Sequence, residues 1–201
     1  MTAVLTVPLL FVRAYSMPSG SMENTLLIGD RMLVRIFPRP LPARGDLILF
    51  HYPLDRKQIF VKRVIGLPGD HVRIKDRVTY LNGRELKEPY VIRTMPAEPL
   101  RDNLPSVPEA MPEELPARTE MLRDHLVSGE VVVPQGKYFV LGDNRDNSFD
   151  SRYWGFVSVS DLTGKPFLIY DSEAGSDTDL QAGTSERGGT HVRWERVFKV
   201  L

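Results

Sequence analysis

The sequence predicts a mainly β fold, built from antiparallel sheets and interrupted by one irregular segment. Its strongest periodic patterns alternate apolar and polar residues with a period of two, which is typical of strands rather than helices. Asn82-Gly83 separates two such runs and predicts a tight hairpin, because both turn residues accept positive φ. The pattern breaks over residues 94–130, which hold six prolines, eight acids and no lysine. We therefore expect an irregular insertion within a β framework.

The predicted elements follow in chain order. Alternation predicts strands at 31–37, 46–52, 58–66, 71–75, 78–81, 137–142, 166–170 and 191–201. Leu67-Pro68-Gly69-Asp70 predicts a type II turn, since proline presets φ and glycine permits the positive φ that follows. Within the irregular segment we expect one short helix near 117–126, closed by Gly129, before strand character resumes at 131–133.

Composition excludes several classes of function. Basic and acidic residues balance at 26 each, so nothing global favours a nucleic-acid partner. There is no cysteine, which excludes disulfides, thiolate catalysis and cysteine zinc sites, and the four histidines show no metal-ligand spacing. We therefore expect neither a metal nor another cofactor. Locally the charge is +4 over 44–77 and −5 over 94–130, which we interpret as solvated faces of opposite sign.

The N-terminal segment 3–12 is apolar apart from Thr6. Its ten residues are too few for a spanning helix, which needs about 20, and Pro8 interrupts them. No basic residue precedes the apolar run, so the segment does not fit a cleaved secretory signal. Two interpretations remain open: a first strand of the core, or the last turns of a membrane anchor.

Lys62 stands in the middle of a predicted strand, where a cation is unusual. Alternation places it on one face with Phe60 and Val64. If this strand lies at an edge, the amine extends to water and has no chemical role. If the amine is instead packed between its apolar neighbours, desolvation lowers its pKa, and the neutral form becomes a competent base for a serine hydroxyl.

Two further stretches carry polar side chains that can act together with Lys62. Pro18-Ser19-Gly20-Ser21-Met22, taken alone, predicts only a loop. The stretch 142–156 is mostly polar at its start and runs into an aromatic cluster, which predicts a network of hydrogen bonds in which Asp150 and Arg152 can pair. Its chemistry alone leaves open whether the network is structural or forms the wall of an active site.

Taken together, these stretches resemble the signature motifs of the type I signal peptidase (leader peptidase) family. The motifs are Pro-Ser-Gly-Ser-Met followed by Thr-Leu-x-x-Gly-Asp, then Lys-Arg-x-x-Gly-x-Pro-Gly-Asp, then Gly-Asp-Asn-Arg-Asp-Asn-Ser-x-Asp-Ser-Arg-Tyr-Trp-Gly. They fall at 15–30, 60–70 and 138–156, in the order that the family has. Three motifs in sequence are a specific signal, although each alone is a moderate one.

The resemblance implies a role for each matching residue. The nucleophile falls on Ser21 and the general base on Lys62. Ser19 matches the serine whose hydroxyl helps to bind the oxyanion, together with the backbone N–H of Ser21, and Ser148 matches the residue that orients the lysine amine. The remaining matches are the polar network of the site, at Asp143, Asp150 and Arg152, and residues near the substrate groove, at Pro18, Met22 and Leu26.

The resemblance also implies a domain organisation and a cellular setting. Family members have a β-rich catalytic core interrupted by a smaller, variable β domain, which places the core at 1–70 and 135–201 and the insertion at 71–134. The implied function is cleavage of signal peptides from exported preproteins after a small-x-small motif. The implied setting is the bacterial cytoplasmic membrane, with a lipid surface as partner and the catalytic domain on the extracytoplasmic side. The family usually has one or two spanning helices before the serine motif, and this chain has at most a remnant.

Two alternative functions stay open. A self-cleaving repressor-type peptidase shares the Ser-Lys pair, but no helical pattern typical of a DNA-binding domain precedes Ser21. A non-catalytic β-barrel binding module would have kept the fold and lost the chemistry. Against it, Ser19, Ser21, Lys62 and Ser148 are all present.

Overall fold

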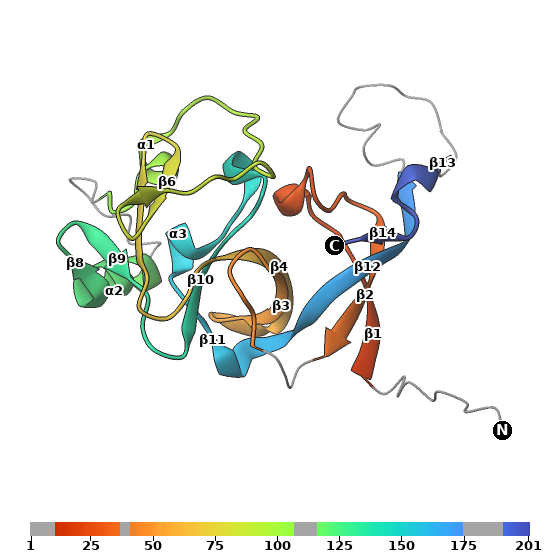
Figure 1. The fold of residues 1–201 in the computed structure, drawn as a ribbon, viewed down its shortest axis with the longest axis horizontal. Helices are drawn as coiled ribbons and strands as arrows, with labels where there is room; N and C mark the ends of the chain where they lie inside the picture. The colour runs from red at the N-terminus through yellow and green to blue at the C-terminus, as the bar shows by residue number, and fades with distance from the viewer. Residues whose placement is uncertain (1–10, 37–40, 107–115, 175–190) are drawn as a thin grey trace.

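A computed structural model describes residues 11–36, 41–106, 116–174 and 191–201. It confirms a mainly β fold with antiparallel sheets (Figure 1). Of the apolar N-terminal segment 3–12, residues 3–10 lie outside the described residues. Among the described residues, no helix is both long and apolar enough to cross a membrane.

The larger sheet has nine strands and contains parts of all three motifs. Its order is β1-β2-β12-β3-β4-β10-β11, and the short strands β13 and β14 pair with β12. The bounds are β1 Val12–Ser16, β2 Asp30–Ile36, β3 Leu47–Tyr52, β4 Asp55–Gly66, β10 Lys137–Leu141, β11 Val157–Ser158, β12 Leu162–Ala174, β13 His191–Val192 and β14 Lys199–Val200. Every pairing in it is antiparallel.

A second sheet of five strands lies beside the first (Figure 1). Its order is β7-β6-β5-β9-β8, with bounds β5 His71–Lys75, β6 Val78–Leu81, β7 Arg84–Glu85, β8 Leu126–Val127 and β9 Glu130–Val132. We propose that residues 71–134 form an inserted domain built on this sheet, with 1–70 and 135–201 as the core. All five of its strands lie within that range.

The short helices lie in the segments between strands of these sheets. The α-helices are α1 Pro99–Asp102, α2 Pro116–His125 and α3 Ser151–Trp154, and the 3-10 turns are η2 Gly20–Met22, η3 Arg145–Asn147, η4 Val159–Asp161 and η5 Trp194–Arg196. The predicted helix near 117–126 is confirmed as α2, and α1 was not predicted. The hairpin at Asn82-Gly83 is confirmed, with φ values of 52° and 74°.

Two predicted strands differ from those observed. The strand expected at 166–170 is part of the longer β12, whose Gly164 packs so closely on β2 that an added Cβ would lie 2.6 Å from the backbone oxygen of Arg35. The prediction of a single strand at 191–201 is wrong. Trp194–Arg196 forms η5 and Phe198 adopts a φ of +65°, so that only β13 and β14 remain extended.

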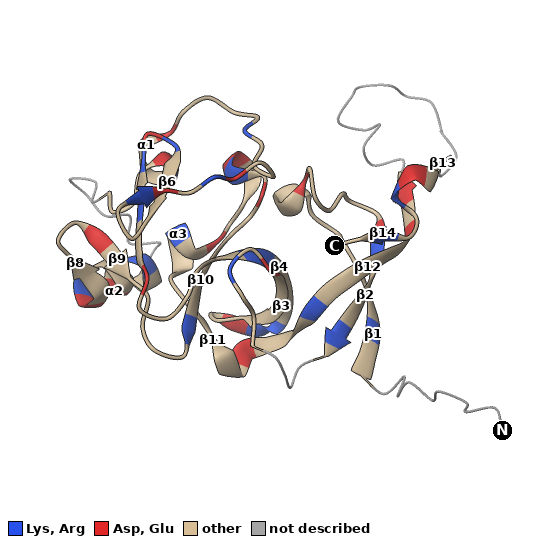
Figure 2. Ribbon diagram, in the orientation of Figure 1, with Lys and Arg blue, Asp and Glu red and all other residues tan. Residues whose placement is uncertain are grey.

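The charged segments were expected to form solvated faces, and this is wrong in part. Figure 2 shows that both signs are interspersed over the two sheets. Within 94–130, Arg101, Asp102 and Arg118 are buried. Asp102 pairs with Arg77 and with Arg101, so charges of the two segments meet inside the molecule. These charges therefore help to dock α1 on the second sheet.

Asp30, at the start of β2, fixes the C-terminal strands to the larger sheet. Its buried carboxylate accepts hydrogen bonds from the Leu27 N–H, the Ser172 hydroxyl and the Arg196 guanidinium. Burial raises the pKa of Asp30, but these hydrogen bonds and the charge of Arg196 outweigh it and hold the pKa below its ordinary value. This one carboxylate thus joins the serine-bearing loop, β12 and η5.

We expect Asp30→Ala to lower the free energy of unfolding by roughly 3–5 kcal/mol at pH 7, because it leaves the buried Arg196 without its partner. Urea denaturation of the purified chain measures this difference. The matched control is Asp171→Ala, which breaks an ion pair with the half-exposed Arg31 and should cost less than about 1 kcal/mol. Equal losses in the two variants would contradict the role assigned to Asp30.

Candidate active site

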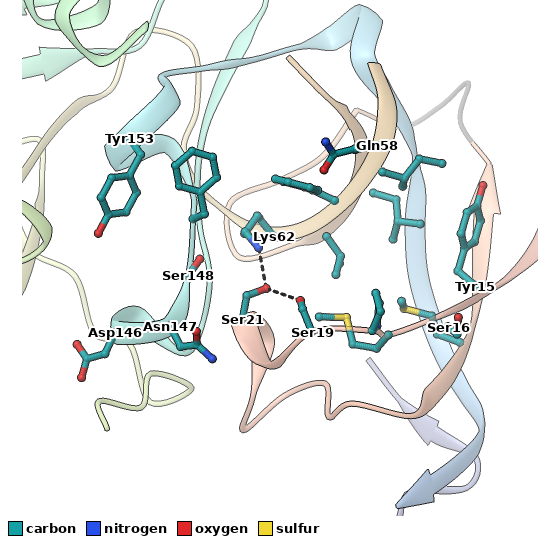
Figure 3. Close-up of a pocket in the computed structure, with 18 residues that line it drawn as sticks. Tyr15, Ser16, Ser19, Ser21, Gln58, Lys62, Asp146, Asn147, Ser148 and Tyr153 are labelled. Carbon is teal, nitrogen blue, oxygen red and sulfur yellow. Dashed lines mark hydrogen bonds between the residues drawn. The ribbon is translucent and has the colours of Figure 1, made fainter. Parts of the chain in front are cut away.

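An open pocket of about 740 Å³ lies where three parts of the larger sheet meet. Its walls are residues 15–19 at the end of β1, residues 58–62 of β4, and the stretch 146–149 together with Tyr153 (Figure 3). β1 is an edge strand of the larger sheet, and β4 pairs with β10 only at residues 63–66. The pocket is therefore bordered by two strand edges that have no partner strand among the described residues.

Ser21 and Lys62 meet at the middle of this pocket. Ser21 stands in the 3-10 turn η2, and Lys62 comes from the face of β4 that looks onto this turn. The amine Nζ donates a hydrogen bond of 2.7 Å to Ser21 Oγ, and Ser19 Oγ lies 3.3 Å from the same oxygen (Figure 3). The three side chains that the motifs single out for nucleophile, base and oxyanion donor are therefore within hydrogen-bonding reach of one another.

The open question about Lys62 is settled by its burial. Only 4% of the residue is exposed, so the interpretation that it extends to water at an edge is wrong. Its Nζ lies 5.5 Å from the centre of the Phe60 ring, and Val64 of the same face is fully buried. Arg63, on the opposite face, is also largely buried and has a carboxylate partner.

Burial lowers the pKa of Lys62 to about 8. The negative charges of Asp150 and Asp143 act in the other direction, and the Arg152 guanidinium lowers the pKa further. Near neutral pH a useful fraction of the amine is then neutral, whereas a solvated lysine, with a pKa of about 10.4, offers only a trace. The geometry and the charge state both suit a general base.

Asp150 is held away from the amine by its own partners. It accepts a hydrogen bond from the Gly142 N–H at 3.0 Å and another from Arg152 Nε at 2.8 Å. Burial raises the pKa of Asp150. The positive charge of Arg152, and the hydrogen bonds that Arg152 and the Gly142 N–H donate to this carboxylate, outweigh the effect of burial, so the pKa lies below its ordinary value. The expected pairing of Asp150 with Arg152 is therefore present.

Asp143 ties together the serine-bearing loop and β4. Arg63 donates to both of its oxygens, and the Thr25 hydroxyl donates to Oδ2 at 2.5 Å. Arg63 also donates to Thr25. The sequence analysis did not single out Thr25 or Arg63, although both stand inside the quoted motifs.

Gly142 allows the polar stretch to approach Ser21 closely. A Cβ at this position would lie 2.2 Å from Ser148 Oγ and 2.4 Å from the backbone oxygen of Ser21. Ser148 is buried and points toward the Lys62 amine (Figure 3). Its hydroxyl, however, has no hydrogen-bond partner among the described residues. The hydrogen bond expected between Ser148 and Lys62 is thus not formed here, whereas the amine donates to Ser21.

The three residues expected near a substrate groove are placed differently. Pro18 lines the pocket. Met22 and Leu26 have no exposed surface and pack in a core cluster with Met17, so that they support the pocket wall from behind. The lining residues that sequence reasoning did not single out include Tyr15, Gln58, Ile59, Phe149 and Tyr153. Tyr15, Phe149 and Tyr153 lie within the motif ranges, whereas Gln58 and Ile59 directly precede the second motif.

Comparisons with known proteins agree with the motifs. The family model described as signal peptidase, peptidase S26, matches residues 1–170. A signal peptidase I of Pseudomonas fluorescens is 36% identical over 200 residues, which are 84% of this chain and 68% of that protein. A signal peptidase I of Bacillus caldolyticus is 36% identical over 170 residues, covering 83% of this chain and 84% of that protein. A crystal structure of a signal peptidase I from Enterococcus faecalis V583 matches with 33% identity and a TM-score of 0.47, covering 64% of this chain and 98% of that one. The chain belongs to the signal peptidase family, peptidase S26.

Proposed function

We propose that this chain is a serine endopeptidase that cuts signal peptides from exported preproteins, with Ser21 as nucleophile and Lys62 as general base. The observation that carries the proposal is the 2.7 Å hydrogen bond between Ser21 Oγ and a buried amine whose pKa is lowered to about 8. A serine hydroxyl is a weak nucleophile unless an adjacent base removes its proton. Membership of the signal peptidase family supports the choice of substrate.

In the proposed reaction, neutral Lys62 takes the hydroxyl proton while Ser21 Oγ forms a bond to the scissile carbonyl carbon. The Ser19 hydroxyl and the Ser21 N–H donate to the resulting oxyanion, and such donors are worth about 10²–10³ in rate. Lys62 then returns the proton to the amide nitrogen as the C–N bond breaks and the new N-terminus leaves. A water molecule, deprotonated by Lys62, hydrolyses the ester and restores Ser21. Ser148, buried beside the amine, is proposed to orient it during these transfers.

The substrate is proposed to bind as an extended strand between β1 and β4. The free edges of residues 15–18 and 58–62 supply backbone partners along the pocket. Main-chain pairing of this kind gives affinity, and pockets for alternate side chains give specificity. Pro18 and its neighbours would then enclose the small side chain that precedes the cut.

Three substitutions at the dyad should each abolish cleavage while the chain remains folded. Ser21→Ala removes the nucleophile and Lys62→Ala the base, and Lys62→Arg fails because a guanidinium stays protonated at any working pH. We expect each to lower kcat by at least about 10³-fold. The assay uses a preprotein with a small-x-small motif, and mass spectrometry identifies the new N-terminus.

The matched control for Lys62→Arg is Lys57→Arg, an exposed lysine on the same strand, which should cleave like the unaltered chain. Circular dichroism of all variants verifies the fold. An active Lys62→Arg chain would refute the general-base role of Lys62. An unaltered chain that leaves the preprotein intact would refute the proposed function itself.

We also propose that a lipid surface is a partner of this chain, at the extracytoplasmic side of the bacterial cytoplasmic membrane. Three large apolar side chains with exposed fractions of 42–59% support the lipid proposal. They are Ile59 on β4, Leu54 in the β3–β4 hairpin and Phe11 just before β1. Ile59 also lines the pocket, so that one of these exposed apolar side chains lies at the site.

Flotation with vesicles of phosphatidylethanolamine and phosphatidylglycerol tests the lipid proposal. We expect the chain to float with the vesicles, and Leu54→Glu to lower the floated fraction by about threefold or more, because a carboxylate resists burial at the interface. The control is Arg84→Glu, on the exposed edge of the second sheet, which should lower the floated fraction less than Leu54→Glu does. A chain that stays entirely below the vesicles would contradict the proposal.

A further inference from the structure

Phe149 is an exposed aromatic residue on the wall of the pocket, and the proposed chemistry does not use it. It is 46% exposed, yet it stands between Ser148 and Asp150, which are both buried. Ser148 and Asp150 have extended backbones, with φ values of −132° and −138°. Successive side chains of an extended chain point to opposite sides. The backbone that buries Ser148 and Asp150 therefore leaves the Phe149 ring exposed, and this ring lines the pocket.

The Phe149 ring is held in place by other aromatic rings. It stacks on Tyr153, with centroids 5.5 Å apart and an angle of 28°, and meets Tyr52 edge to face at 6.1 Å. Tyr52 in turn stacks on Phe60 at 4.7 Å and contacts the buried Trp154. Phe149 and Tyr153 are thus the pocket-facing end of a packed aromatic cluster rather than a loose surface pair.

The chemistry of the dyad decides which half of a substrate lies against these rings. Ser19, on one side of Ser21, is the proposed oxyanion donor, and Lys62 must return a proton to the leaving amide nitrogen. The leaving half therefore starts beside Lys62, on the side away from Ser19. Figure 3 shows Ser148 and Tyr153 on that side of the dyad, and Tyr15, Ser16 and Gln58 on the other. The residues after the cut then pass along Phe149 and Tyr153.

We propose that Phe149 and Tyr153 form an apolar subsite for one of the first two residues of the released chain, and that this subsite prefers an apolar or aromatic side chain. This inference rests on the proposed function, because it needs a scissile bond at Ser21. It adds a determinant after the cut to the small-residue selection before it. A half-exposed aromatic wall gains stability when a substrate side chain covers it, and an added apolar group in such a site changes kcat/KM by about tenfold.

The test compares peptides that are identical before the cut and carry Ala, Asp, Leu or Phe at the first or second position after it. We expect kcat/KM for Leu or Phe to exceed that for Ala by about tenfold at one of the two positions. In Phe149→Ala this ratio should fall to nearly one, while the Ala peptide keeps its kcat/KM within about threefold. Phe149→Leu should retain part of the preference, because it keeps an apolar wall.

Ile59→Ala is the matched control, since Ile59 is 42% exposed and lines the same pocket on β4. It should leave the preference after the cut unchanged. Binding of the same peptides to Ser21→Ala, measured by fluorescence anisotropy, reports the subsite without any cleavage. Equal binding and turnover of the Ala and Phe peptides by the chain with Phe149 intact would overturn this inference alone, and so would a preference that survives in Phe149→Ala. Absence of cleavage, with the binding preference intact, would instead contradict the proposed function.

Discussion

Lys62 brings a positive charge into the wall of the pocket, where it has little contact with water and hydrogen-bonds a serine hydroxyl. Burial of an ammonium group costs free energy unless a counter-charge compensates it or the group loses its proton. In this fold the charges of Asp150 and Asp143 compensate the burial only in part, and the pKa of Lys62 falls to about 8. The rest of the site is arranged so that this low pKa is preserved while the amine stays aimed at Ser21.

The two nearby carboxylates show how that arrangement works. Asp150 and Asp143 would restore the charged amine if either contacted it, since an opposite charge at short range favours the ionised form. Each instead has a guanidinium partner, Arg152 for Asp150 and Arg63 for Asp143. The Arg63–Asp143 pair also binds the loop after β10 to β4, and Thr25 joins Asp143 to the serine-bearing loop. The two carboxylates thus hold the site together through their arginine partners and do not contact the Lys62 amine.

The second sheet contributes to the site from a distance. Arg145 pairs with Glu88, and Asp146 accepts hydrogen bonds from Arg77 and from the Met95 N–H. Both residues directly precede the segment that carries Ser148 and Phe149. The proposed inserted domain therefore fixes the loop on which one wall of the pocket depends, through Arg77, Glu88 and the Met95 N–H.

Much of the fold was predictable from local patterns. Period-two alternation gave the bounds of β5 and β6 correctly, and the positive-φ preference of Asn82-Gly83 identified the hairpin between β6 and β7. The prediction for 191–201 failed because tertiary contacts decide that segment: Arg196 turns inward to Asp30, and η5 interrupts the strand. Alternation cannot reveal a long-range ion pair.

The site was predictable from its motifs and less so from its chemistry. The residues alone left Lys62 open between a surface and a buried position, because alternation does not show whether a strand face is covered. The absence of the expected hydrogen bond between Ser148 and Lys62, the position of Met22 and Leu26 behind the wall, and the contacts of Thr25 and Phe149 depend on how distant segments pack. No spacing along the chain encodes those contacts.

The most direct test of this account is a titration of the Lys62 amine itself, followed by NMR on a chain with lysine labelled at Cε and assigned by comparison with Lys62→Met. We expect a midpoint near pH 8 for Lys62, with the neutral fraction rising as pH rises. Phe60→Asp should move the Lys62 midpoint to higher pH, because a carboxylate beside the amine favours its charged form. A Lys62 midpoint near 10.4 would contradict the claim that the fold prepares this amine as a base.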